Sequence, residues 1–109
     1  MSSPNYPLVL SDLAQADYED ILAYTLRTWG ARQHAIYADL LDEALHALQD
    51  DPQRGHHHRQ LPERYRYVHV ERHLIVYRFT QGTVYVVRLL HDRMDVPQHI
   101  EEAEEDDLP

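Results

Sequence analysis

Two helix-forming stretches separated by a single glycine constrain this chain more than any other feature of its sequence. Apolar residues recur at helical spacing in both. They are Ala14, Tyr18, Ile21, Leu22, Thr25 and Trp29 in the first stretch, and Tyr37, Leu40, Leu41, Ala44, Leu45 and Leu48 in the second. Ser11 offers an N-cap oxygen, Gly30 ends the first helix, and the second stops before Pro52. So short a connection forces an antiparallel hairpin, in which we expect Tyr24 and Trp29 to be structural core residues.

Extended segments flank this hairpin on both sides. A short apolar run around residues 6–10 predicts an edge strand, where Pro7 is tolerated. Segments 65–70, 74–79 and 83–90 are rich in Val, Ile and Tyr, and Gln81-Gly82 is typical of a two-residue hairpin turn. Residues 50–63 read as a loop. The order predicts an α+β fold, with an N-terminal strand and an α-helical hairpin packed on a small antiparallel β-sheet.

The hairpin turn fixes which strand residues face each other. It places Phe79 opposite Val84, Tyr77 opposite Val86 and Ile75 opposite Arg88 on one side of the sheet. It places Val76 opposite Val87 and Arg78 opposite Tyr85 on the other, with Leu74 and Leu89 nearby. Both faces are then largely apolar, but the hairpin covers one. We expect the other to be an exposed partner site, the alternative being that residues 50–63 or the C-terminal segment fold over it.

Length and composition bound the remaining possibilities. With 109 residues, 43% of them hydrophobic, the chain predicts one domain over residues 1–100, followed by an acidic, disordered tail over 101–109. The absence of cysteine excludes disulfides, thiolate zinc sites and thiol catalysis. No apolar run suits a bilayer and the N-terminus does not resemble a secretory signal, so we expect a cytoplasmic protein without membrane contacts.

Charge is divided unevenly along the chain. The formal net charge is −9, and all ten basic residues are arginine. Residues 1–53 hold nine acids and two arginines, residues 54–100 hold four acids and eight arginines, and residues 101–109 hold six acids. The basic second half therefore leaves anionic partners open despite the overall acidity.

Four stretches carry a resemblance to a known family. They are Leu10-Ser11-Asp12-Leu13-Ala14-Gln15-Ala16-Asp17 leading through Asp20-Ile21 and Tyr24-Thr25 to Trp29-Gly30; Asp51-Pro52-x-x-Gly55; Arg72-His73-Leu74-Ile75-Val76-Tyr77-Arg78; and Val87-Arg88-Leu89-Leu90-His91-Asp92-Arg93-Met94-Asp95. In this order the chain resembles the RelE/ParE superfamily of type II toxin–antitoxin toxins over about residues 6–100, and is most similar to the ParE branch.

The resemblance implies a toxin that acts by binding and is neutralised by a ParD-like antitoxin in a hetero-oligomer. The expected target is DNA gyrase, operator DNA is contacted only through the antitoxin, and no cofactor is expected. From the resemblance and the residues together, we expect the toxic surface at Arg78, Arg88, His91 and Arg93. We expect antitoxin binding at Val76, Tyr85, Val87 and Leu89, aided by the outer helix faces.

Two alternatives remain open. The RelE branch cleaves messenger RNA on the ribosome, which needs cationic groups at the scissile phosphate and a proton-transferring group. This chain has no lysine and no tyrosine after Tyr85, but His91 with Arg88 and Arg78 could supply such a site. The other alternative is an inactive remnant that still binds an antitoxin.

The remaining histidines and arginines admit further interpretations. His56-His57-His58, with His69 and His73, suggests a metal site, but without cysteine at zinc-site spacings we favour a solvated histidine loop and expect no metal. Arginines interleaved with tyrosines resemble a stacking platform for nucleic acid. No groove-reading motif accompanies them, so we rank direct DNA binding low.

Overall fold

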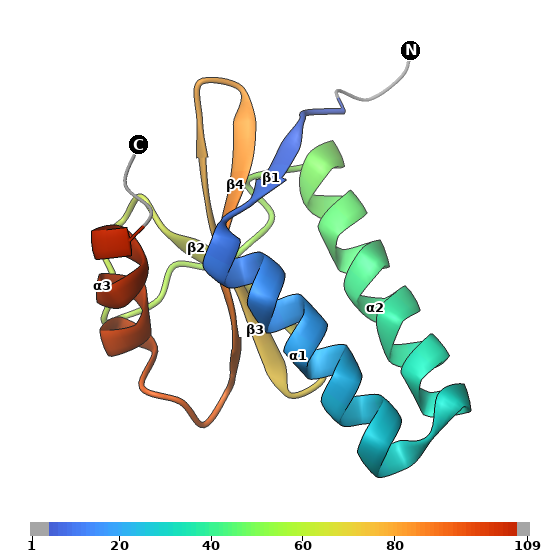
Figure 1. The fold of residues 1–109 in the computed structure, drawn as a ribbon. Coiled ribbons are helices and arrows are strands. Elements are labelled where there is room, and N and C mark those ends of the chain that lie inside the picture. Colours follow the sequence, from blue (N-terminus) through green and yellow to red (C-terminus); the bar gives the residue numbers. More distant parts are fainter. Residues whose placement is uncertain (1–4, 107–109) are drawn as a thin grey trace.

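A computed structural model describes residues 5–106 of the chain. The elements are β1 (Leu8–Leu10), α1 (Asp12–Trp29), α2 (Ala31–Asp50), β2 (Arg66–Val70), β3 (His73–Thr80), β4 (Thr83–His91) and α3 (Val96–Asp106). The α+β fold is confirmed: the α1–α2 hairpin lies on one side of a four-stranded sheet and α3 on the other (Figure 1). None of the helices in the described part has the length and apolarity needed to cross a membrane.

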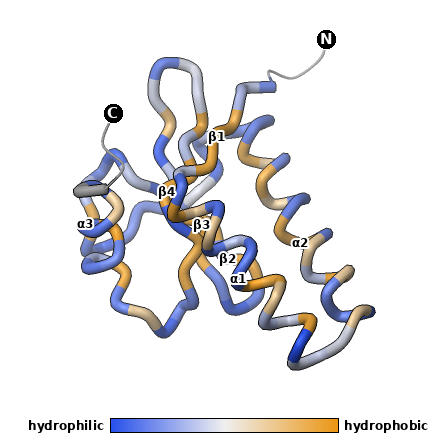
Figure 2. Tube along the Cα trace, viewed as in Figure 1, coloured by the Kyte–Doolittle hydropathy of each residue, from blue (hydrophilic) through white to orange (hydrophobic). Residues whose placement is uncertain are grey.

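The sheet has the order β1-β4-β3-β2, so the first strand lies at an edge, as predicted. It pairs with β4 in parallel, whereas β2, β3 and β4 are antiparallel. Apolar colour gathers along β1, β3 and β4, while α1 and α2 alternate between apolar and polar segments (Figure 2). This alternation gives the hairpin one apolar face to pack on the sheet.

A β-bulge changes the predicted register between β3 and β4. The pairs nearest the turn, Phe79 with Val84 and Tyr77 with Val86, are confirmed, but the register shifts between Val76 and Tyr77. Val76 therefore faces Arg88, not Val87 as we expected, and Ile75 faces Leu89 instead of Arg88. The extra residue is inserted at Val87 in β4, and such a bulge exchanges the faces on which the following side chains lie.

Ser11 ties the bulge to the start of α1. Its hydroxyl donates to the Val87 carbonyl over 2.7 Å and accepts from the Ala14 amide over 2.9 Å, which makes Ser11 the N-cap of α1. Its own amide donates to the Val86 carbonyl. One serine thus joins β1, the first turn of α1 and the irregular part of β4.

The main core lies between the hairpin and the sheet. Its buried members are Ala14, Tyr37, Leu41, Leu48, Val70, Ile75, Tyr77, Val84, Val86 and Leu89. The loop after α2 is fastened to this core by the buried phenol of Tyr77, which donates to the Pro52 carbonyl (2.6 Å) and accepts from the Gly55 amide (3.0 Å). A side chain at Gly55 would collide with that phenol, so only glycine fits this close approach.

A second core on the opposite face corrects our expectation of an open apolar surface. Its buried members are Tyr65, Leu74, Val76, Leu90, Val96 and Ile100, with Leu61, Tyr67 and Val87 at its margin. α3 and the loop before β2 cover much of that face, as in the alternative given in the sequence analysis. Residues 101–106, which we expected to be disordered, form the last part of α3. The helix extends this far because Ala103 is buried on the same side as Val96 and Ile100. Residues 107–109 lie outside the described residues.

The tip of the helical hairpin is also more open than expected. Tyr24 is 57% exposed and Trp29 is 67% exposed, so our assignment of both to the hairpin core is wrong. Helical spacing gives the direction of a side chain, but it does not show how far along the helix the sheet extends.

Candidate functional site

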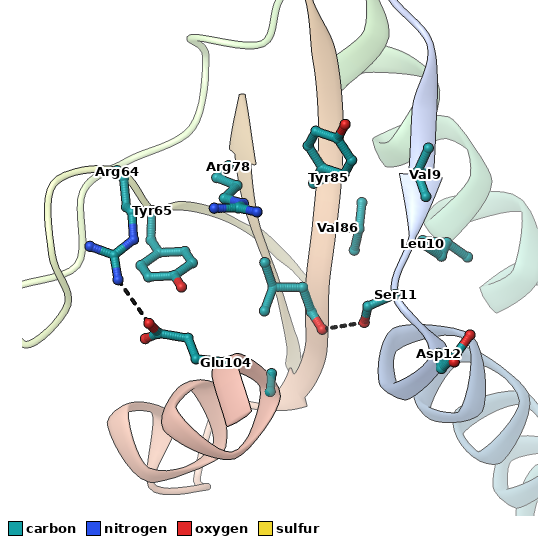
Figure 3. Close-up of a pocket in the computed structure, with 12 residues that line it drawn as sticks. Val9, Leu10, Ser11, Asp12, Arg64, Tyr65, Arg78, Tyr85, Val86 and Glu104 are labelled. Carbon is teal, nitrogen blue, oxygen red and sulfur yellow. Dashed lines mark hydrogen bonds and ion pairs between the residues drawn. The ribbon is translucent and has the colours of Figure 1, made fainter. Parts of the chain in front are cut away.

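An open groove of about 410 Å³ crosses the second face of the sheet, in the part that α3 leaves uncovered. Its lining comes from β1 and the start of α1, from β3 and β4, and from a far wall formed by α3 and the residues just before β2. The residues are Val9, Leu10, Ser11, Asp12, Arg64, Tyr65, Arg78, Tyr85, Val86, Val87, Ala103 and Glu104 (Figure 3). The groove therefore has a largely apolar lining, in which the charged residues are Asp12, Arg64, Arg78 and Glu104.

Arg78 is the cation of the groove floor. Its guanidinium carbon lies 5.6 Å from the centre of the Tyr85 ring, and Figure 3 shows the side chain between Tyr65 and Tyr85. Among the described residues, no carboxylate forms an ion pair with it. Stacking on Tyr85 leaves the charge of Arg78 directed toward the open groove, where an anionic group could reach it.

The far wall of the groove is a charge-paired cluster. Arg64 donates to Glu104 of α3 over 2.8 Å and lies over the Tyr65 ring at 4.9 Å. Burial raises the pKa of Tyr65, and the Tyr65 hydroxyl and Glu104 together raise the pKa of Arg64. Arg64 is half exposed, so this pair contributes little to the stability of the fold.

Of the four residues predicted to bind an antitoxin, two are accessible in the structure and two are buried. Tyr85 and Val87 line the groove and stay accessible. Val76 and Leu89 are 0% and 2% exposed, one in each core, so they are not part of an accessible surface in this conformation. The bulge accounts for Leu89, since it turns this residue toward the hairpin.

Arg88, predicted for the toxic surface, lies in a partly buried ion pair. Its guanidinium donates twice to the Asp17 carboxylate of α1, over 2.8 and 2.9 Å, and the same carboxylate accepts from the Leu89 amide. The side chain of Arg88 is 12% exposed, and hydrogen bonding to Asp17 raises its pKa. Asp17 thereby binds the stretch of β4 that lies beyond the end of β1.

His91 and Arg93 lie at the far end of β4. The His91 ring meets the His73 ring edge-on at 5.4 Å, and His91 Nδ1 lies 3.3 Å from Asp92 Oδ1. The Arg93 amide donates to His91 Nδ1, which in the neutral ring places the proton on Nε2. Asp92 also lies 3.4 Å from His69. This end of the sheet is a histidine-rich cluster with Arg93 exposed beside it.

The candidate nuclease residues do not converge. Arg78 faces Tyr85, and His91 lies six positions further along the same strand. Because the bulge adds one residue to β4, Arg78 and His91 are only five positions apart along the ladder, which at about 3.3 Å per position is roughly 17 Å, too far to act on one phosphate. Arg88, between them, is held by Asp17.

The histidine loop packs on a tyrosine. The rings of His56 and His58 lie 5.9 and 5.7 Å from the Tyr67 ring, and His56 forms a β-bridge with Tyr67. Within residues 5–106 no three His, Asp or Glu side chains are grouped so as to hold a metal ion.

Three groove residues escaped the sequence analysis. We expected Val9, 48% exposed, only as part of an edge strand, Arg64 only among the arginines interleaved with tyrosines, and Glu104 in a disordered tail. Val96, Ile100 and Ala103 follow helical spacing, and that signal could have placed Glu104 on a helix.

His73 gives the fold a testable acid sensitivity. Burial against Tyr37 and His91 lowers the pKa of His73, so the neutral ring is favoured in the folded state. This contribution to stability is present above the unfolded pKa of about 6.5 and is lost as pH falls through the folded pKa. In urea denaturation, His73→Gln should lose less stability than the wild type between about pH 7.5 and about pH 5. His57→Gln, an exposed control, should match the wild type, and equal losses for His73→Gln would contradict the assignment.

Comparisons with known proteins agree on one family. The family model described as the ParE toxin of the type II toxin–antitoxin system parDE matches residues 8–96. Toxin ParE1 of Mycobacterium tuberculosis is 36% identical over 93 residues, covering 84% of this chain and 95% of the relative. Toxin ParE1 of Caulobacter vibrioides is 32% identical over 94 residues, covering 86% and 97%. A solved structure described as the chromosomal ParDE TA system from P. aeruginosa superposes with a TM-score of 0.68 at 16% identity, covering 80% of this chain and 96% of that one.

Proposed function

The chain belongs to the ParE toxins of type II toxin–antitoxin systems, and on that premise we propose that a ParD-like antitoxin holds it inactive and that the free toxin inhibits DNA gyrase. The observation that carries the antitoxin part is the groove. It is an apolar strip, with Tyr85 and Val87 accessible, on a sheet whose two faces are otherwise packed by the chain's own helices. Such a strip suits a partner segment that excludes water from it.

Arg78 links neutralisation to toxicity in this proposal. An antitoxin in the groove covers Arg78, so the cation becomes unavailable to the target. We propose that Arg78, His91 and Arg93 contact the target, while Arg88 acts through Asp17 by holding β4 against α1. Operator DNA is reached through the antitoxin in the hetero-oligomer.

Target binding requires no converging catalytic groups, and this favours gyrase over messenger RNA. A ribonuclease needs its acid, base and cations around one phosphate, whereas Arg78 lies on β3 opposite Tyr85 and His91 lies at the far end of β4. A binding toxin can use separated contacts on a broad surface.

The test is induction of the chain alone in a bacterial host, with growth, DNA-damage signalling and transcript integrity measured together. We expect growth arrest with a damage response and intact transcripts, and inhibition of supercoiling by purified gyrase. Arg93→Glu should weaken both effects, whereas Arg27→Glu, an exposed control on α1, should not. Arrest with cleaved transcripts and no damage response would support a nuclease instead. Normal growth with soluble expression would indicate an inactive remnant.

A further inference from the structure

The tip of the α1–α2 hairpin contributes no buried side chain to either core. The last buried residue of α1 is Thr25 and the first of α2 is Tyr37, and every residue between them is exposed or only partly buried. Figure 1 shows this turn as the part of the hairpin farthest from the strands. The side chains of residues 26–36 are therefore available to a partner.

Large apolar side chains gather at this tip. Most of the exposed large hydrophobic residues of the described chain lie here, with Tyr24 57%, Leu26 47%, Trp29 67% and Ile36 43% exposed. Leu26 and Trp29 are three residues apart and share one face of α1, whereas Tyr24 lies about 140° around the helix from Trp29. Leu26, Trp29 and Ile36 all lie within about 9 Å of the turn along the helix axes, and we call them the tip patch.

The tip carries positive charge in an acidic chain. No acidic residue occurs between Asp20 and Asp39, an interval that holds Arg27 and Arg32, although the net charge of the chain is −9. Arg32 is exposed, shares a face of α2 with Ile36 and, within the described part of the chain, forms no ion pair with a carboxylate. Tryptophan and arginine are typical of binding hot spots, and an arginine without a carboxylate partner favours a binding partner with acidic groups around an apolar pocket.

The tip is remote from the groove. Ser11 and Asp12 line the groove at the start of α1, whereas Trp29 ends that helix, so the two surfaces are about 25 Å apart along α1. A peptide segment that fills the groove does not by itself cover Trp29. The chain therefore has two separate interaction surfaces, and the proposed function requires two partners.

We propose that the tip patch docks into an apolar pocket with an acidic rim on the target protein, gyrase, and that Arg32 meets this rim. The aliphatic side chains of Leu26 and Ile36 favour a protein pocket over a nucleic acid, whose bases stack on aromatic rings. The inference rests on the proposed function, because it names the surface that holds the target. These contacts supplement the cationic ones proposed above on the sheet.

The first measurement is inhibition of supercoiling by the purified full chain, with purified gyrase as the probe. Trp29→Ala should raise the concentration for half-maximal inhibition at least about tenfold, because it removes the largest side chain of the tip patch. Arg32→Glu should also raise it, by reversing the charge at the rim. Tyr24→Ala is the matched control, since it removes an exposed aromatic ring from another face of α1, and it should leave inhibition unchanged. All these positions are exposed, so the variants should fold as the wild type does.

The second measurement locates the contact. The chain contains no cysteine, so the Ile36→Cys and Tyr24→Cys variants each provide one thiol, and mass spectrometry follows its alkylation. Excess gyrase should slow alkylation of the Ile36→Cys variant severalfold and leave that of the Tyr24→Cys variant unchanged. Equal protection of both thiols, or protection of neither, would overturn the inference.

The outcomes separate this inference from the proposed function. Inhibition that is unchanged in Trp29→Ala would reject the tip as the docking surface and leave gyrase inhibition standing. A wild-type chain that neither inhibits gyrase nor binds it would reject the proposed target together with this docking. Light scattering covers the remaining occupant of the patch. A wild-type dimer that Trp29→Ala converts to a monomer would show that the tip patch binds a second copy of the chain instead.

Discussion

Replacing Asp17 with alanine should lower the free energy of unfolding by about 3 kcal/mol, measured by urea denaturation. The substitution leaves the Arg88 guanidinium, 12% exposed, without its bidentate partner, and it removes the acceptor of the Leu89 amide. Both groups then lose hydrogen bonds that water at this site does not fully replace. The loss should be this large because one carboxylate serves three donors.

Two companion variants separate this cause from a general effect of changing α1. Asp20→Ala removes an exposed carboxylate from the same helix and should cost less than about 0.5 kcal/mol. Asp17→Asn keeps an acceptor for the Leu89 amide and should fall between the two. If Asp17→Ala were no more destabilising than Asp20→Ala, the ion pair would not support the fold as described.

Gly55→Ala should cost about 2–3 kcal/mol by the same measurement. A methyl group at this position would meet the Tyr77 hydroxyl, lie 2.8 Å from the Tyr77 ring and lie 3.0 Å from the Tyr67 carbonyl. Tyr77 is fully buried and cannot withdraw, so the loop must move and give up the bonds from Tyr77 to Pro52 and from Gly55 to Tyr77.

Gly82→Asn is the matched control. Gly82 lies in the β3–β4 turn with φ +73 and has nothing within 4 Å of an added Cβ. Asparagine tolerates this left-handed conformation, so a small loss is expected. The double variant Gly55→Ala/Tyr77→Phe should lose less than the two single variants together, because both disrupt the same bonds. Full additivity would show that the clash lies elsewhere.

The hairpin and the strands could be predicted because their causes are local. Helical spacing, Gly30 and Pro52 set the ends of α1 and α2 within a residue, and the Gln81-Gly82 turn set the first pairs of the β3–β4 ladder. The bulge could not be predicted, since it depends on Ser11 meeting the Val87 carbonyl 76 residues away. α3 was missed for a different reason: its acidic residues obscured the spacing of Val96, Ile100 and Ala103.

The candidate site was predicted in part for the same reasons. Arg78 and Tyr85 lie before the bulge, where the turn controls the register, and the structure places both in the groove. Val76 and Leu89 lie where α3 and the bulge decide which surface stays open, and both are buried. The ion pair of Arg88 with Asp17 joins residues 71 positions apart, and no local pattern reveals it.

The pairing of β1 with β4 affects the order in which the parts of the molecule fold. Within the sheet, β1 and the N-cap of α1 contact only β4. The hydrogen bond from Ser11 to the Val87 carbonyl, for example, joins residues 76 positions apart. Contacts this distant in sequence raise the contact order and slow folding. During synthesis the hairpin can form early, but the groove, which needs β1, β4 and α3 together, exists only after α3, the last element, has left the ribosome. A nascent toxin therefore lacks this surface while it is being synthesised, and any partner that binds the groove can bind only the released chain.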